Sequence, residues 1–428
     1  MEFKIKDICI INKNSIKKNN YPNIIEYLDT KNLVNGEFKD IINLNRFFDK
    51  IPSRAKRLVQ KNDILISTVR PNQKHFGFIT NMQSNYVVST GFAVITANQN
   101  LVNPYYLYKY FTLEKTINYL QNIAENSTSA YPSIKPSVLG ELSIDLPSRN
   151  VQNFIANILK SMDDKIDLNK KIIANLEELS QTLFKRWFVD FEFPDENGNP
   201  YKSSGGEMVD SELGKIPKYW KISNLDKIAS FVSRGITPKY NENSDIQIPI
   251  INQKVNKGPR LDLQYIKYFD GQNRIKKELY AQKNDLLLNS LGQGTLGRIH
   301  LFTRKSEEFL IDQHISIIRF DNINYSYFYY AHINTDLIQG QIDSLISGST
   351  GMLMLNITKI RNLKVILPTE ELVLKYSKLV NEYFGKITQL IYENENLTQL
   401  RDALLPKLMS GEIDIPDNIE VNEDELSI

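Results

Sequence analysis

Asn103-Pro-Tyr-Tyr-Leu-Tyr-Lys-Tyr110 recurs further along the chain as Asn324-Tyr-Ser-Tyr-Phe-Tyr-Tyr-Ala331, at an offset of 221 residues. The same offset superposes Leu146-Pro147 on Leu367-Pro368, and no gap is needed between residue 103 and about residue 187. An internal repeat constrains the architecture more firmly than local propensity does, because each copy must form the same unit. The sequence therefore predicts two copies of one mixed domain of about 150 residues, each followed by a long helix.

The repeat also extends upstream, with shifts of one or two residues. Lys61-Asn-Asp-Ile-Leu-Ile-Ser67 matches Lys283-Asn-Asp-Leu-Leu-Leu-Asn289, and Gly91-Phe-Ala-Val-Ile95 matches His314-Ile-Ser-Ile-Ile318. We therefore expect an α+β fold with two pseudo-symmetric globular α/β domains separated by two long antiparallel coiled-coil helices. The expected boundaries are 1–147 and 210–368 for the domains, 148–189 and 369–411 for the helices, 190–209 for a linker, and 412–428 for an acidic tail.

Each expected helix begins after Leu-Pro with a residue type preferred at helix N-caps, Ser148 or Thr369. Apolar residues then recur at alternating intervals of three and four, which is the pattern of a coiled-coil seam. The seam contains Met162, Ile166, Ile173, Leu176, Leu183 and Trp187 in the first helix, and Ile387, Leu390, Leu397, Leu404 and Leu408 in the second. Two seams of equal length favour pairing between the helices. The alternative is that each helix packs only on its own domain.

The composition is that of a folded protein without a reactive cysteine or metal framework. Hydrophobic residues make up 41% and charged residues 24% of the chain, which excludes a disordered or fibrous chain. The single cysteine, Cys9, excludes a disulfide framework, and the four histidines lack metal-ligand spacing. No stretch is long and apolar enough to cross a membrane, and the charged start does not resemble a signal peptide. We expect a cytoplasmic protein.

The net charge of +2 conceals an uneven distribution. Residues 1–147 contain 18 Lys or Arg against 12 Asp or Glu, and residues 210–368 contain 21 against 15. The tail 412–428 has seven acidic residues and no basic one. Two basic domains of equal charge suit a polyanionic partner. Charge alone is equally compatible with an ordinary protein surface.

Three segments in and after the helical regions resemble a known family. They are Leu183-Phe-Lys-Arg-Trp-Phe-Val-Asp-Phe-Glu-Phe-Pro194, Ser203-Ser-Gly-Gly-Glu-Met208, and Leu400-Arg-Asp-Ala-Leu-Leu-Pro-Lys-Leu-Met-Ser-Gly-Glu-Ile413. With the repeated layout, they are similar to the specificity subunit of type I restriction-modification systems. The resemblance covers nearly the whole chain. The helical regions carry it most specifically, whereas the two domains match in pattern only.

The resemblance implies a DNA-binding role that depends on other chains. Each domain would be a target-recognition domain that reads one half of a bipartite duplex site. The paired helices would act as a spacer and as the dock for two methyltransferase subunits, which restriction and translocase subunits join. S-adenosylmethionine, ATP and Mg would bind to those partner subunits. The resemblance implies no cofactor, metal or catalytic residue in this chain.

The chain contains one stretch that fits a nucleotide-binding loop, Gly292-Gln-Gly-Thr-Leu-Gly297. The next residues, Arg298-Ile-His-Leu-Phe302, favour a strand, whereas a phosphate-binding loop requires a following helix N-terminus. The Asn103-Pro-Tyr-Tyr sequence lacks the second proline of an adenine methyltransferase motif and is interpreted as a helix start. Two alternatives stay open: a self-sufficient fused restriction nuclease or methyltransferase, and a helical adaptor without a DNA role.

Loop residues that donate and accept hydrogen bonds are the best candidates for reading bases, and basic or hydroxyl side chains suit phosphates. Each candidate is equally compatible with an ordinary solvated residue, so the clusters matter more than their members. In the first repeat the candidates are Arg54, Lys56, Arg57, Arg70, Asn72, Gln73, Lys74, Ser127 and Thr128. In the second repeat they are Arg274, Lys276, Lys277, Gln293, Thr295, Arg298, Ser349 and Thr350.

Overall fold

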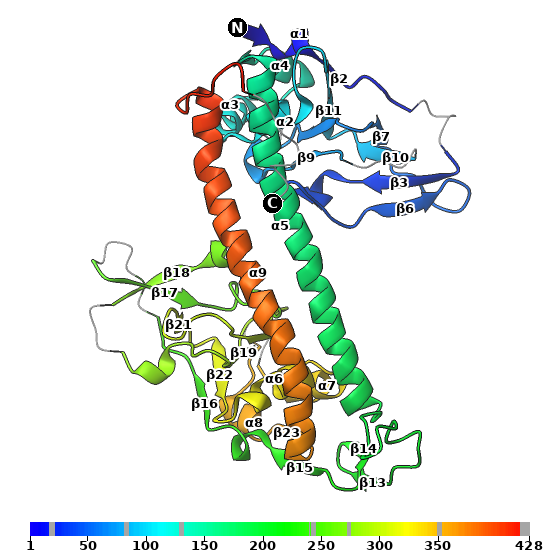
Figure 1. Ribbon diagram of the computed structural model, residues 1–428, viewed down its shortest axis with the longest axis vertical. Helices are drawn as coiled ribbons and strands as arrows, with labels where there is room; N and C mark the ends of the chain where they lie inside the picture. The colour runs from blue at the N-terminus through cyan, green and yellow to red at the C-terminus, as the bar shows by residue number, and fades with distance from the viewer. Residues whose placement is uncertain are drawn as a thin grey trace. The chain divides into compact units, whose positions relative to one another are not determined.

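The computed structural model describes residues 1–16, 22–80, 85–127, 132–238, 240, 245–271, 275–348 and 353–419 (Figure 1). Internal contacts divide the chain into two compact units. Unit 1 comprises Met1–Leu168 together with Glu393–Ile428, and unit 2 comprises Asn169–Tyr392. Each unit thus combines one globular part with segments of both long helices. Within the described ranges, no helix is long and apolar enough to span a membrane.

The described residues of unit 1 form two four-stranded sheets and two short strand pairs, one of which joins β4 (Leu33–Val34) and β5 (Glu37–Phe38). The first sheet, here called the helix-covered sheet, has the order β2-β11-β8-β9, formed by Cys9–Ile11, Phe92–Ala97, Ile64–Ser67 and Phe76–Phe78. The second, called the distal sheet, has the order β6-β3-β10-β7, formed by Ile42–Asn45, Ile24–Leu28, Tyr86–Ser89 and Ala55–Leu58. Strands β1 (Glu2–Lys4) and β12 (Ser143–Asp145) pair antiparallel.

Unit 2 repeats this arrangement. Its helix-covered sheet has the order β16-β22-β19-β20, formed by Phe231–Arg234, Ile315–Arg319, Leu286–Asn289 and Ile299–Leu301. Its distal sheet has the order β18-β17-β21, formed by Lys267–Asp270, Gln247–Ile251 and Leu310–Ile311. Strands β15 (Lys221–Asn224) and β23 (Lys364–Leu367) form the short pair equivalent to β1 and β12, and β13 (Met208–Ser211) pairs with β14 (Gly214–Pro217). The order of the helix-covered sheets is identical in the two units, which confirms the internal duplication.

Short elements complete each unit. In unit 1 these are α1 (Ile5–Ile8), η1 (Thr30–Asn32), β4 (Leu33–Val34), β5 (Glu37–Phe38), η2 (Pro71–Gln73), α3 (Glu114–Glu125) and α4 (Pro136–Gly140). In unit 2 these are η3 (Lys185–Val189), β13 (Met208–Ser211), β14 (Gly214–Pro217), η4 (Leu225–Lys227), η5 (Leu263–Tyr265), η6 (Lys277–Leu279), α7 (Asp336–Leu345) and α8 (Ile357–Arg361).

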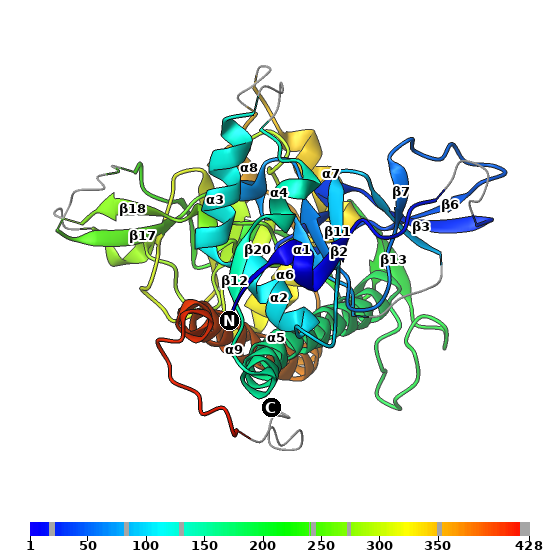
Figure 2. The same cartoon turned by 90° about the horizontal axis from the view of Figure 1, so that it is seen from above.

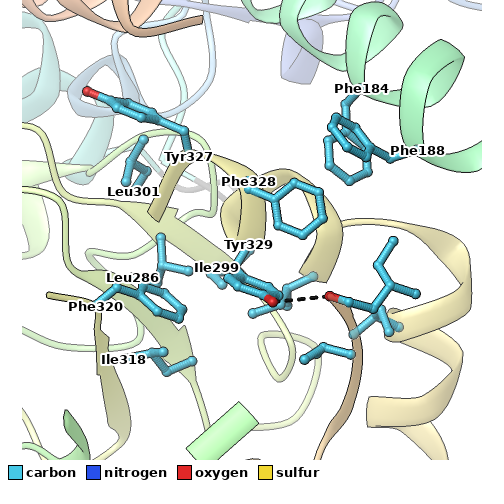
Figure 3. Packing of buried hydrophobic residues seen from close by; sticks show 14 of the residues in the cluster. Phe184, Phe188, Leu286, Ile299, Leu301, Ile318, Phe320, Tyr327, Phe328 and Tyr329 are labelled. Atoms are coloured by element: carbon cyan, nitrogen blue, oxygen red, sulfur yellow. Dashed lines mark hydrogen bonds between the residues drawn. The ribbon is translucent and has the colours of Figure 1, made fainter. Parts of the chain in front are cut away.

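The tyrosine-rich repeat forms helices α2 (Pro104–Thr112) and α6 (Ile323–Ile333), each packed on the helix-covered sheet of its unit. The Asn103 side chain caps α2 by accepting hydrogen bonds from the backbone N–H groups of Tyr105 and Tyr106. In unit 2, the ring of Tyr329 is buried and its hydroxyl donates to the Ile366 carbonyl at 3.1 Å (Figure 3). These aromatic side chains belong to the core and are not free to stack on bases.

The long helices are α5 (Arg149–Phe184), which continues through the single π-helical turn η3, and α9 (Glu370–Ser410). In unit 1, Leu159 of α5 shares one hydrophobic cluster with Leu408 of α9. In unit 2, Ile173 of α5 shares a cluster with Ile387 and Leu390 of α9. The start of α5 therefore meets the end of α9, and the end of α5 meets the start of α9. This is the expected antiparallel pairing.

The expected seam residues point into these cores. Met162, Ile166, Ile173, Ile387, Leu390 and Leu408 are buried, and Leu176, Leu183, Trp187, Leu397 and Leu404 are half-buried. Both interpretations of the helices contribute, since each seam packs against the other helix and against the globular part of its unit. The contact with the other helix and the contact with the globular part are compatible, because a helix can bury more than one row of side chains.

The segment 190–209, expected as a linker, is an ordered part of unit 2. The ring of Phe193 stacks between those of Tyr201 and Trp220, with centroid separations of 4.6 and 5.5 Å. The side chain of Glu192 accepts a hydrogen bond from the backbone N–H of Ser203 at 3.1 Å. The turn-forming composition of this stretch is compatible with irregular backbone, but its aromatic residues anchor it to the core.

Candidate nucleic-acid interface

The first candidate loop is the connection between the antiparallel strands β8 and β9 in unit 1. It contains the single turn η2, flanked by Arg70 and Lys74, whose φ angles of 48° and 55° are left-handed. The backbone N–H of Arg70 donates to the Pro132 carbonyl at 2.9 Å, and that of Asn72 donates to the Gln121 side chain at 3.1 Å. These bonds hold the loop in one tight conformation while the side chains of Arg70 and Asn72 are exposed.

Two further candidates of this loop have partners within the protein. The ammonium of Lys74 forms an ion pair with Glu114 on α3. The side-chain oxygen of Gln73 lies 3.1 Å from Nε2 of His75. The structure thus places Arg70, Asn72, Gln73 and Lys74 together at one tip, and the charge of Lys74 is partly balanced there.

The second candidate loop of unit 1 lies directly beside the first. The backbone N–H of Ile134 donates to the Thr68 carbonyl at 2.8 Å, and Val69 forms an isolated β-bridge with Ser133. The Ser127 hydroxyl accepts from the backbone N–H of Ser133 at 3.5 Å. Thr128 lies outside the described residues. Ser127 and the β8–β9 loop therefore belong to one surface.

Unit 2 repeats this pairing of loops. Its candidate loop connects the antiparallel strands β19 and β20, and the backbone N–H of Leu355 donates to the Ser290 carbonyl at 2.9 Å. Leu291 forms a β-bridge with Met354, which ties the loop to the segment after residue 346. Ser349 and Thr350 of that segment lie outside the described residues.

The tip of the β19–β20 loop is closed by its own polar groups. The hydroxyl of Thr295 donates to the Gly292 carbonyl at 3.2 Å, and Nη2 of Arg298 donates to the Gly294 carbonyl at 2.8 Å. Gly292 and Gly294 adopt φ angles of 108° and 74°, which glycine tolerates without strain. Gln293 is exposed. The next element is strand β20, so the GxGxxG sequence forms a hairpin loop and presents no helix N-terminus to a phosphate.

Arg54 immediately precedes β7, and Lys56 and Arg57 lie within it, on the distal sheet. Arg54 is exposed, and its carbonyl accepts from the backbone N–H of Thr90 at 2.8 Å. The adjacent Gly91 carbonyl accepts from the backbone N–H of Thr68 at 2.9 Å, so this end of β7 adjoins the β8–β9 loop. Lys56 is exposed, whereas Arg57 is half-buried.

Arg57 differs from its two neighbours in having a structural contact. Its Nη1 donates to the Ser15 hydroxyl at 3.2 Å, and burial lowers the pKa of its guanidinium. Arg57 is therefore a weaker candidate for DNA than Arg54 or Lys56, because its side chain already joins two segments of the protein.

Two of the corresponding cations of unit 2 lie at η6, and the residue after η6, Tyr280, forms a β-bridge with Leu310 of the distal sheet. Lys276 immediately precedes η6 and Lys277 begins it, and both are exposed. Their ammonium groups lie 3.8 and 3.9 Å from the carboxylates of Glu278 and Glu307. Arg274 lies outside the described residues. Lys276 and Lys277 are therefore the weakest candidates for a DNA-binding surface, because each already lies near a carboxylate.

The structure adds a basic loop in unit 2 that the sequence patterns did not single out. Between β17 and η5, the side chain of Asn256 is fully buried and donates to the Leu287 carbonyl at 2.9 Å. Asn289 donates to the Asn256 carbonyl at 3.1 Å. These bonds fix the loop against β19, beside the hairpin. They leave three basic residues exposed on it: Lys254, Lys257 and Arg260.

This loop could have been found from the repeat. It follows β17 as the segment 29–40 follows β3, and it contains three basic residues at intervals of three beside Gly258-Pro259. Basic residues at regular spacing in a loop with turn formers are a recognisable electrostatic signal. The decisive observation, the burial of Asn256, is a tertiary contact that the sequence does not display.

The buried histidines do not form a metal site. Burial lowers the pKa of His300 to about 4 and that of His332 to about 3, so both are neutral at pH 7. His332 accepts a hydrogen bond from the backbone N–H of Ile366 at 3.2 Å. Among the described residues, no group of three or more His, Cys, Asp or Glu is arranged to hold a metal ion.

Comparison with known proteins supports the same assignment for both units. The model of the family described as type I restriction modification DNA specificity domain matches residues 1–178 and 217–390. The two matched ranges together cover most of the chain, and each contains one globular part and the beginning of its long helix.

The chain is also similar to individual members over its whole length. The specificity subunit of type I restriction enzyme HindI from Haemophilus influenzae is 28% identical over 462 residues, covering 96% of this chain and 99% of the relative. The MjaIX specificity subunit from Methanocaldococcus jannaschii is 28% identical over 398 residues, covering 91% and 87%. A crystal structure of a type I S subunit from M. genitalium has a TM-score of 0.57 at 17% identity and covers 95% of both chains, which supports the fold.

Proposed function

Because the chain belongs to the type I restriction modification DNA specificity domain family, we propose that each unit reads one half of a split duplex site through its paired loops. The chain is a DNA-recognition subunit of a type I restriction-modification system and is not itself an enzyme. The two family matches fall on the two repeats, as bipartite recognition requires. No comparison supports the alternative of a fused nuclease or methyltransferase.

The observation that supports this proposal most directly is the pairing of loops in both units. In each, backbone contacts join a hairpin of the helix-covered sheet to a second segment, at Ser133 and Ile134 in unit 1 and at Met354 and Leu355 in unit 2. The positions are equivalent, but the exposed residues differ: Arg70 and Asn72 in unit 1, Gln293 in unit 2. Equivalent loops with different side chains suit two different half-sites, because base edges are distinguished by their pattern of donors and acceptors.

We further propose that partner subunits bind the long helices. Because the seam residues are buried in the cores, the partner subunits would bind apolar residues of the same helices that lie outside the seams. These residues, each 45 to 53% exposed, are Leu168 and Leu179 on α5 and Leu374, Leu379 and Leu400 on α9. Two methyltransferase subunits would bind there and restriction subunits would join them. S-adenosylmethionine, ATP and Mg would bind to those chains, and the complex would act in the cytoplasm.

The test uses the full chain assembled with its methyltransferase subunit. The target is identified first, as the split motif whose methylation in genomic DNA depends on this chain. Duplexes carrying that motif, or with either half scrambled, are then titrated against the Arg70→Gln/Lys74→Gln double variant and the Gln293→Ala/Arg298→Gln double variant. Glutamine is chosen because Arg70 and Lys74 have left-handed φ angles, which a β-branched replacement would adopt only with strain.

We expect each double variant to lose discrimination at one half-site only. A lost base contact reduces discrimination by about 1–3 kcal/mol, whereas a lost phosphate contact weakens binding to all sequences and lowers the salt slope by roughly 0.9. Equal loss at both half-sites, or no loss at either, would contradict the assignment of one unit to one half-site.

A further inference from the structure

A turn of unit 1 presents two aromatic rings to solvent. It follows β6 and comprises Asn45-Arg-Phe-Phe-Asp49. Phe47 is 63% exposed and Phe48 is 87% exposed. Exposed phenylalanine is unfavourable in water, and adjacent pairs of this kind mark interaction sites on folded proteins. Neither ring contributes to a hydrophobic cluster among the described residues of unit 1.

The turn is held rigid by its flanking polar side chains. The Asn45 side chain accepts from the backbone N–H of Phe47 at 3.0 Å, and the Asp49 carboxylate accepts from the backbone N–H of Asn45 at 2.8 Å. The Asn45 carbonyl accepts from the backbone N–H groups of Phe48 and Asp49 at 3.1 and 2.7 Å. Four hydrogen bonds fix the backbone of the turn, so little backbone entropy is lost on binding.

The surroundings of the rings are positively charged. The guanidinium carbon of Arg46 lies 4.6 Å from the centroid of the Phe47 ring. Lys50, one residue after the turn, is exposed, and Asp49 is the one acidic residue of the turn. An apolar tip with Arg46 and Lys50 beside it suits an anionic polymer with stackable interior faces, which is the chemistry of duplex DNA.

The turn also lies within reach of the same half-site as the β8–β9 loop. Ile24, at the start of β3, pairs with Asn45, whereas Leu28, at the end of β3, pairs with Val88 of β10. Three residues after Val88, the Gly91 carbonyl accepts from the backbone N–H of Thr68 at the β8–β9 loop. Figures 1 and 2 both show β3 and β6 at the edge of unit 1 that lies away from α5. Four residue steps of strand span about 13 Å, which corresponds to roughly four base pairs at about 3.4 Å each.

We propose that Phe48 is a wedge that enters a base step of the first half-site, with Phe47 and Arg46 supporting it at the groove. This inference rests on the proposed function, because it assumes that unit 1 binds duplex DNA. An inserted apolar side chain unstacks the step and favours sequences that deform easily, such as pyrimidine–purine steps. Phe48 would then select sequence without forming a hydrogen bond to any base.

The wedge would belong to the first half-site alone. The sequence that follows β18, the strand equivalent to β6, is Gly271-Gln-Asn-Arg-Ile275 and contains no aromatic residue. The two halves of the target should therefore differ in deformation as well as in sequence.

The test places 2-aminopurine at successive positions of both half-sites, in duplexes carrying the mapped split motif. The full chain assembled with its methyltransferase subunit is added, and fluorescence and affinity are measured. We expect a rise in fluorescence at one step of the first half-site that is abolished by Phe48→Ala and retained by Phe48→Trp. Affinity for the intact site should fall about 5- to 100-fold in Phe48→Ala.

The matched control is Tyr219→Ala, which removes a ring that is 72% exposed in unit 2 and should change neither readout. Wild-type complex that binds no split duplex would overturn the proposed function itself. Wild-type binding that Phe48→Ala leaves unchanged, or a fluorescence signal that persists in Phe48→Ala, would overturn only the wedge. Loss of methyltransferase assembly in Phe48→Ala, seen by size-exclusion chromatography, would identify the turn as a protein contact and also overturn it.

Discussion

The two units use different chemistry at the same position of the repeat, where the tyrosine-rich helix meets the long helix that follows it. At the offset of 221 residues, Lys109 aligns with Tyr330 and Asp163 aligns with Phe384. In unit 1 these positions form a buried ion pair, and in unit 2 they form an edge-to-face pair of rings with centroids 5.7 Å apart. The fold tolerates either solution, because both bury the interface with satisfied partners.

The polar solution of unit 1 is a network rather than a single pair. The Asp163 carboxylate accepts from Lys109, from the hydroxyl of Tyr105, and from Nη1 of Arg401 at 2.7 Å. Burial alone would raise the pKa of Asp163, but the charges of Lys109 and Arg401 outweigh it and hold that pKa below its usual value. Arg401 belongs to α9, so directional bonds tie the end of α9 to α5.

In unit 2 the same place is apolar and less directional. Phe384 stacks on Tyr327 with a centroid separation of 5.4 Å, and Ser180 occupies the position equivalent to Arg401. Buried ion pairs contribute little net stability but are costly to disrupt, and they can fix which segments pair. We infer that the network of unit 1 selects the correct partner and register for the end of α9, where the seam alone is weakly specific.

The largest effect is expected from Asp163→Ala, which leaves the cations Lys109 and Arg401 buried without their carboxylate. Removal of one partner from a buried ion pair costs about 3–5 kcal/mol. Hydrogen exchange of the amides in β8 and β11 should report this loss for unit 1 in the full chain at pH 7. Tryptophan fluorescence should change little, because Trp187 and Trp220 both belong to unit 2.

Two variants sharpen this comparison. Asp164→Ala removes the neighbouring carboxylate, which is 58% exposed and pairs with Lys160 one helical turn away, so it should cost no more than about 0.5 kcal/mol. The triple variant Lys109→Tyr/Asp163→Phe/Arg401→Ser copies the residues of unit 2 and should recover most of the lost stability. If Asp163→Ala costs no more than Asp164→Ala, the network does not stabilise unit 1.

The next effect concerns stability at acid pH, where unit 2 should lose more stability than unit 1. In unit 2, His300 and His332 have pKa values lowered by burial to about 4 and about 3. Between these values and 6.5 the unfolded chain binds more protons, so stability is present above pH 6.5 and decreases as the pH falls. Each histidine should cost about 2 kcal/mol between pH 6.5 and pH 5. Urea denaturation followed by tryptophan fluorescence measures this slope in unit 2.

The matched variant is His332→Phe, because Phe111 occupies the equivalent position of unit 1. The variant loses the bond from the Ile366 N–H and should be less stable at pH 7. Its loss between pH 6.5 and pH 5 should nevertheless be about half that of the wild type. In unit 1, the lowered pKa of Asp163 places its contribution to acid sensitivity below about pH 4. An unchanged slope in His332→Phe would mean that this histidine is protonated without unfolding.

The sequence predicted those features of the fold that repeat or follow a simple period. The alignment of Asn103 with Asn324 predicted the duplication, and the three-four spacing of residues such as Ile173 and Leu390 predicted the paired helices. Both are encoded by residues that must be apolar in every copy. Arg401 lies on the same spacing, four residues after Leu397 and three before Leu404, but the spacing does not indicate its carboxylate partner, because Asp163 lies 238 residues away.

The candidate interface was predictable only in outline. Hairpin positions such as Arg70 and Gln293 follow from polar residues between strands, and the structure places both at loop tips. The basic loop containing Lys254 and the aromatic turn containing Phe48 were not singled out, because their importance depends on burial and exposure. The sequence alone does not distinguish the exposed Phe48 from a buried phenylalanine, or the buried Asn256 from an exposed asparagine.

The smallest effect is expected from Glu114→Gln, which releases Lys74 at the tip of the β8–β9 loop. The paired side chains are 40 and 65% exposed, so the ion pair should contribute at most about 1 kcal/mol and unit 1 should keep nearly its full stability. The freed ammonium should instead gain one phosphate, which raises affinity for the first half-site about 2- to 5-fold and steepens the salt slope by roughly 0.9. The second hairpin has Thr335 at the equivalent position and offers no carboxylate to remove. Gel-shift titrations over a range of salt concentrations measure both quantities, and an unchanged slope would show that Lys74 does not reach the DNA backbone.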